Sequence, residues 1–138
     1  MKLKLYGCLL FAVVGLIAQQ QTQAPRVTGF FSDMRPTEAG DVVGTEIWIV
    51  YARGHYWAAV QEAEGEPNPP VVVPLDVSGL STIKFTLTTH VVHGDGTPAP
   101  DLIRRYEGTV TEGGLLLSTP ELSGSTPTLL KRHNSYWQ

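Results

Sequence analysis

Two histidines and an aspartate stand close together in the sequence, as His90, His93 and Asp95, at the end of a strand-like segment. Imidazole and carboxylate groups are ligands that Zn²⁺ accepts, and His55 could join them from a turn earlier in the chain. On an extended chain an odd spacing places His90 and His93 on opposite faces, so chelation requires a turn near Val92. The alternative is two polar residues at a strand end, and we expect no resident metal or other cofactor.

Four aromatic residues, Trp48, Tyr51, Tyr56 and Trp57, gather around one predicted turn. Their ring faces could stack on a sugar or an apolar ligand at the mouth of a barrel, or contact a protein partner. The alternative is that they form core or cross-strand pairs. We interpret them as the candidate contact residues for a ligand or partner.

The sequence contains no pattern typical of an enzyme. It has no Gly-x-Ser-x-Gly elbow and no glycine-rich loop before a helix, so we predict no catalytic residue and no phosphate cradle. Glu62, Glu64 and Glu66 alternate along one strand and would share a side of it. They are either a weak Ca²⁺ or basic-partner contact, or a solvated strand end whose like charges discourage edge pairing.

The elements that must position these residues begin with a hairpin over 41–65. Val43, Thr45, Ile47, Ile49 and Tyr51 fall on one face of its first strand, and residues 52–54 supply the turn. This is the longest run of strand-favouring residues in the chain.

Further strands follow the same pattern of alternation. In the segment 81–91, Ile83, Phe85 and Leu87 share one face and should point inward. Pro74 inside 71–77 indicates an edge position or a bulge. The other expected strands are 26–32, 103–112, 115–117 and 126–132, separated by loops at 33–41, 66–70 and 93–101 and a turn at 121–125.

No segment after the N-terminal one shows helical periodicity. We therefore predict an all-β fold, an antiparallel up-and-down β-barrel of about eight short strands, with a β-sandwich as the alternative. The interior of such a barrel is either filled by side chains or holds one small ligand.

The N-terminus is typical of a cleavable signal helix. Residues 1–4 are basic and 9–18 are apolar, too short a run to span a membrane. We predict a signal peptide over 1–18, a disordered leader over 19–25 and a single barrel domain over 26–138, hence a periplasmic or secreted protein with no membrane span in its mature form. A retained anchor, or a lipoprotein box at 5–8, are the alternatives.

Cleavage would remove Cys8, the one cysteine, and leave a mature domain without disulfides. Without Lys2 and Lys4, eight basic residues oppose thirteen acidic ones, a net charge of −5. This mild acidity argues against a nucleic-acid partner, which requires clustered lysine and arginine.

The strand at 106–110, Tyr-Glu-Gly-Thr-Val, and the closing 129–132, Leu-Leu-Lys-Arg, complete a pattern that resembles the small secreted lipocalin-like or calycin-like barrels of bacteria. In lipocalins a Gly-x-Trp on the first barrel strand packs its Trp under a basic residue from the last strand. Here Gly44 and Gly54 are followed by a tryptophan only after four and three residues, so that motif is absent, while Lys131 or Arg132 would be the closing basic residue. The resemblance implies the barrel and no particular ligand.

Three functional hypotheses follow. The first is a secreted or periplasmic, non-enzymatic binding module for a small apolar or amphipathic ligand, with a cavity lined by the strands at 45–51 and 83–87. The second is an interaction protein, an inhibitor or an envelope accessory protein, with a solid core. The third is a histidine-dependent metalloenzyme in which the three histidines meet.

Overall fold

The computed structural model describes residues 26–120, 126–132 and 134–136. In this part of the chain the strands are β1 (Gly29–Ser32), β2 (Arg35–Pro36), β3 (Val42–Ala52), β4 (His55–Gly65), β5 (Val71–Ser78), β6 (Thr82–Thr89), β7 (Leu102–Thr111), β8 (Gly114–Ser118) and β9 (Thr128–Arg132).

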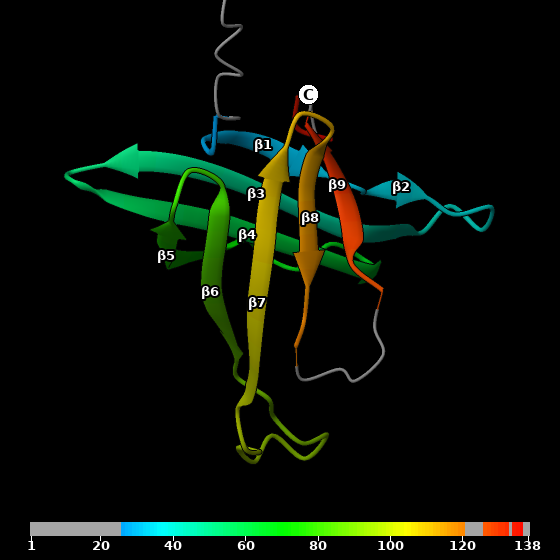
Figure 1. Ribbon diagram of the computed structural model, residues 1–138. Coiled ribbons are helices and arrows are strands. Elements are labelled where there is room, and N and C mark those ends of the chain that lie inside the picture. Colours follow the sequence, from blue (N-terminus) through cyan, green and yellow to red (C-terminus); the bar gives the residue numbers. More distant parts are fainter. Residues whose placement is uncertain (1–25, 121–125, 133, 137–138) are drawn as a thin grey trace, which may run out of the picture.

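These strands form one antiparallel sheet that closes on itself (Figure 1). From β3 to β9 each strand pairs with the next in the chain, and β1 closes the barrel by pairing with both β9 and β3. The predicted up-and-down barrel of eight strands is confirmed, and β2 is an extra two-residue strand beside β3 within the predicted loop 33–41. In the described residues no helix is long and apolar enough to span a membrane.

The β3–β4 hairpin projects beyond its neighbours, at the left of Figure 1. Arg53 and Gly54 form its turn with φ angles of 53° and 82°. Two successive positive φ values are typical of a type I′ turn, whose twist matches that of the strands it joins. Eleven residue pairs then hold β3 against β4, so this hairpin is a long, continuous ladder.

The interior of the barrel is filled by side chains. Ile47 and Ile49 from β3 meet Ile83, Phe85 and Leu87 from β6 in one buried cluster, so the predicted inward faces of both strands are confirmed. Because these residues pack together, the two strands face each other through side chains. Leu87 and Thr45 line separate pockets. The remaining members of the cluster are Val27, Phe31, Ala58, Val60, Val73, Leu75, Tyr106, Val110, Leu115, Leu117 and Leu130.

The first and last strands meet through an arginine. The guanidinium of Arg132 lies 4.5 Å from the ring centroid of the fully buried Phe31. Arg132 Nη1 donates to Thr28 O at 2.9 Å, and Nη2 donates to Arg26 O. Glycine at position 29 leaves room for the Arg132 guanidinium, because a Cβ there would lie 2.6 Å from Arg132 Nη1.

The C-terminal segment is attached to the outside of β3. Glu46 points away from the core, in phase with Trp48, yet it is buried. Ser135 Oγ donates to Glu46 Oε1 and Tyr136 N to Oε2, each at 2.7 Å. The carboxylate of Glu46 thus holds residues 135 and 136 against the wall of the barrel.

Candidate functional site

The barrel wall is incomplete between β5 and β6. β5 pairs with β4 up to Leu75 and with β6 only from Asp76 onward, where the ladder consists of three residue pairs. Pro74 lies just before this change of partner, and proline has no N–H to contribute to a ladder. Of the two expected alternatives, an edge position or a bulge, Pro74 occupies a local edge: it pairs with Trp57 of β4 and has no partner on β6. The first half of β5 parts from the second half of β6 (Figure 1).

A pocket of about 310 Å³ occupies this opening. It lies at the loop end of the barrel, which we define as the end bearing the connections 66–70 and 90–101. Val60, Val71 and Leu87 provide apolar walls, and Glu62 and Arg104 provide charges. The other lining residues are Asn68, Pro69, Thr88, Thr89 and His90.

Glu62, Arg104 and Tyr106 form a hydrogen-bonded group inside the barrel, which we call the polar triad. Tyr106 Oη donates to Glu62 Oε1 at 2.6 Å, and Arg104 Nη2 donates to Glu62 Oε2. The side chains of Glu62 and Arg104 are only 15% and 28% exposed, so both charges are largely withdrawn from water. Their pairing is what makes this burial tolerable.

Tyr106 stays protonated in this environment. Burial raises its pKa above 10, and the hydrogen bond to the Glu62 carboxylate raises it further. Phe85 stacks on its ring, with centroids 4.9 Å apart and planes 14° from parallel. Tyr106 therefore acts as a fixed hydrogen-bond donor and not as a base.

Arg104 retains unused donor capacity. Its Nε is buried and has no hydrogen-bond acceptor among the described residues. A buried donor left in this state costs about 1–3 kcal/mol. Such a group is rare in native structures and calls for an explanation.

A second, smaller pocket of about 190 Å³ lies on the other side of the polar triad. Glu62 and Tyr106 line it together with Asp33 and Thr45. Asp33 Oδ1 accepts a hydrogen bond from Thr45 N at 2.7 Å, which ties the β1–β2 segment to β3. Glu62 is the residue common to both pockets, so the triad divides the mouth of the barrel in two.

The predicted metal ligands do not come together. His55 follows the β3–β4 turn, whereas His90, His93 and Asp95 belong to the β6–β7 connection at the loop end. His90 Nδ1 lies 2.9 Å from Asp101 Oδ1. The carboxylate of Asp95 accepts hydrogen bonds from Thr97 N and Oγ1, which lower its pKa.

Across the described ranges no three His, Cys, Asp or Glu side chains lie close enough to hold a metal ion. The metal interpretation of His55, His90, His93 and Asp95 therefore has no geometric support in the described residues.

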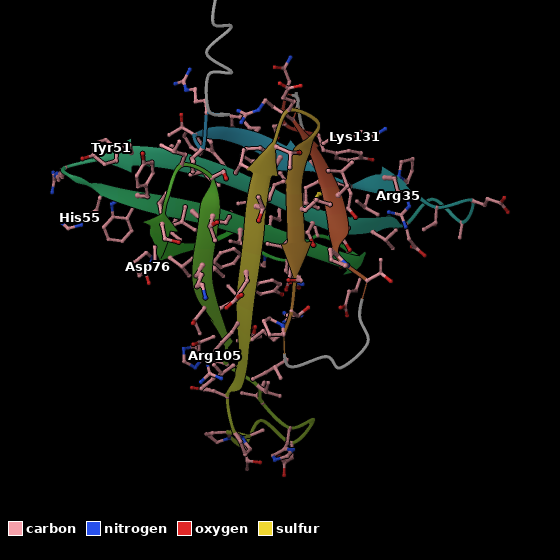
Figure 2. The ribbon with its side chains drawn as sticks, in the orientation of Figure 1. Arg35, Tyr51, His55, Asp76, Arg105 and Lys131 are labelled. Carbon is pink, nitrogen blue, oxygen red and sulfur yellow. The ribbon has the colours of Figure 1, made fainter. Side chains whose placement is uncertain are left out.

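The four predicted aromatic contact residues are divided between two surfaces. Trp48 and Trp57 point outward from the barrel wall, because their neighbours Ile47, Ile49 and Ala58 point inward. Tyr51 and Tyr56 lie opposite each other at the projecting hairpin end, with ring centroids 4.7 Å apart. Figure 2 labels Tyr51 and His55 at this end.

The polar triad was not predicted. We expect Glu62, Glu64 and Glu66 to share one side of a strand, as a weak Ca²⁺ or basic-partner contact or as a solvated strand end. Glu62 is instead paired inside the barrel, whereas Glu64 and Glu66 are exposed. A signal was present: Glu62 is in phase with Ala58 and Val60, and Arg104 with Tyr106. A charged residue at an inward position on each of two strands indicates an internal pair.

Scans of family models, of curated proteins and of solved structures find no match to this chain.

Proposed function

We propose that this protein is a secreted or periplasmic, non-enzymatic binding module that holds a small amphipathic molecule in the opening between β5 and β6. The observation that carries the proposal is the 310 Å³ pocket itself, where Val60, Val71 and Leu87 face the charged pair of the polar triad. Mostly apolar walls with a few polar groups are typical of small-molecule sites.

The ligand's head group is uncharged and accepts a hydrogen bond. Glu62 and Arg104 already balance each other, so a second carboxylate beside Glu62 would be repelled. Arg104 lines the pocket and has more N–H donors than the one it gives to Glu62, so it can supply a donor for a hydroxyl, ester or carbonyl oxygen. Aliphatic alcohols, esters and ketones fit this chemistry.

The family resemblance supports a binding role in a second way. Gly29 and Phe31 have the spacing of a Gly-x-aromatic motif, and Phe31 packs under Arg132 of the last strand. This is the arrangement that lipocalins make with tryptophan. We infer a lipocalin-like barrel in which phenylalanine takes the place of that tryptophan.

Export is part of the proposal. The basic residues 1–4 and the apolar run 9–18 support a signal peptide, although both lie outside the described residues. Mass measurement of the protein from its natural cells tests this, because cleavage after Ala18 leaves a chain that begins at Gln19.

Isothermal titration with octan-1-ol, octanoate and octylamine tests the binding proposal. We expect octan-1-ol to bind best, since the three probes share one chain and differ in head group. Val71→Trp should fill the pocket and weaken binding about tenfold or more, equivalent to about 1.4 kcal/mol. Leu129→Trp is the matched control, because Leu129 is as exposed as Val71, at 41%, but lies on β9 outside the pocket.

Equal binding by the two tryptophan variants would contradict the site. A preference for octylamine or octanoate would contradict the uncharged head group.

A further inference from the structure

The outer wall of β1, β3, β4 and β5 carries a continuous apolar surface, which we call the aromatic face: Phe30, Trp48, Val50, Trp57 and Val72. Strand register makes it continuous, since Trp48 lies opposite Phe30 and Ala59, Ala59 opposite Val72, and Val50 opposite Trp57. Trp48 is 47% exposed and Trp57 36%. The rings of Phe30 and Trp48 stack with centroids 5.1 Å apart and planes 6° from parallel.

Arginines border this surface although the protein is acidic as a whole. Arg26 and Arg132 line a shallow groove of about 480 Å³ together with Phe30, Trp48 and Tyr51, and no acidic residue of the described chain lines that groove. Arg53 stands at the adjoining hairpin turn. The net charge of the full chain is −3, so the positive charge here is local.

The two groove arginines also repel each other. Burial, and then the positive charge of Arg26, lower the pKa of Arg132. An anion placed between these guanidinium groups would relieve that repulsion.

Aromatic side chains with guanidinium groups at their border match one kind of surface in particular. Tryptophan and tyrosine favour the headgroup level of a lipid bilayer, and each arginine close to an anionic bilayer contributes about 1 kcal/mol of attraction. We propose that the aromatic face docks on an anionic membrane surface, with Trp48 and Trp57 at headgroup level and the three arginines against lipid phosphates. Tyr51 and His55 mark the projecting end of the β3–β4 hairpin, which adjoins this surface (Figure 2).

Sedimentation with lipid vesicles tests the proposal. We expect the protein to bind phosphatidylcholine vesicles that contain phosphatidylglycerol and to bind pure phosphatidylcholine at least tenfold more weakly. Tryptophan emission should shift to the blue on binding, because Trp48 and Trp57 would leave water. High salt should release the protein, since surface charges are screened.

Variants then locate the contact. Trp48→Ala and Trp57→Ala should each weaken vesicle binding about tenfold, and Arg53→Glu should weaken binding to anionic vesicles by at least fivefold while leaving the weak binding to neutral vesicles unchanged. Leu129→Ala, on β9, is the control for an exposed apolar residue elsewhere on the wall. Thermal melting confirms that each variant is folded.

Three results would overturn the proposal. One is the absence of binding to either vesicle; another is equal binding to both, which would remove the role of the arginines. The third is a concentration-dependent dimer in light scattering that Trp48→Ala abolishes, since a second copy of the chain would then cover the face.

Discussion

At the scale of single residues, the polar triad is the most unusual feature of this small barrel. Glu62, Arg104 and Tyr106 bring two charges and a phenol to the mouth of a core that is built mainly from aliphatic and aromatic side chains. Replacing a buried ion pair by apolar residues is often neutral or stabilising, so such a pair is weak evidence for a role in stability. Its position beside two pockets fits a role in recognition.

Tyr106 should make stability fall at alkaline pH. Its pKa is raised in the folded protein, so above pH 10 the unfolded chain loses a proton that the folded chain keeps, and the free energy of unfolding decreases as pH rises. Tyr106→Phe should flatten that decrease, while lowering stability at neutral pH by about 1–2 kcal/mol through the lost hydrogen bond. Urea unfolding at a series of pH values measures both effects, and identical slopes above pH 10 would contradict the assignment.

Arg132 should contribute strongly to stability while its neighbour does not. Arg132→Ala removes the contact with Phe31 and two hydrogen bonds to backbone carbonyls, at a cost of about 2–4 kcal/mol. Lys131→Ala is the control, because Lys131 is exposed and such changes stay within about 0.5 kcal/mol. Chemical unfolding measures the free energy of unfolding of both variants. If the two variants lose similar amounts of stability, Arg132 does not close the barrel.

At the scale of elements, two pairs of neighbouring strands in the barrel are held by short ladders, which we call seams. β1 and β9 share two residue pairs and β5 and β6 share three, whereas β3 and β4 share eleven. Figure 1 shows β3 and β4 crossing the direction of β6 to β9, so the seams lie where the sheet turns a corner. The β1–β9 seam is reinforced by Arg132, and the β5–β6 seam is left open beside the candidate site.

Hydrogen exchange should reveal the open seam within β6. Thr82–Lys84 pair with strands on both sides, whereas Phe85–Thr89 pair with β7 alone. Because unpaired edge amides are free to exchange, we expect faster average exchange in Phe85–Thr89, and slower exchange there once octan-1-ol is bound. Exchange that is uniform along β6 would contradict an open seam.

Much of this architecture could be predicted, because apolar and polar residues alternate within each strand and this pattern is visible in a short stretch of sequence. The inward faces of β3 and β6 and the special position of Pro74 followed from residues read within each segment. Alternation within each strand indicates that Glu62 and Arg104 face inward, but it does not indicate which partner each one meets. The two residues are 42 positions apart in the sequence and come together only once the barrel closes.

The closing contact was missed for a different reason. A Gly-x-Trp pattern does not indicate this contact, because the residue two positions after Gly29 is Phe31, whose ring lies under Arg132. Proximity in sequence groups the four aromatic residues around one turn, but strand alternation sends Trp48 and Trp57 outward and Tyr51 and Tyr56 to the other face.

At the scale of the whole molecule, the candidate surfaces occupy different parts of the barrel. The pocket lies at the loop end between β5 and β6, and the aromatic face lies on the outer wall beside the projecting hairpin. A variant in one surface should leave the other intact, so Val71→Trp should still bind vesicles and Trp48→Ala should still bind octan-1-ol.

Native mass spectrometry of the mature protein, purified from the cells that produce it, tests the central claim most directly. We expect an added mass that disappears when the same sample is denatured, and that is absent from Val71→Trp prepared in the same way. The released molecule should be amphipathic and uncharged. A bare protein mass for the wild type under conditions that preserve its fold would contradict a ligand-holding barrel.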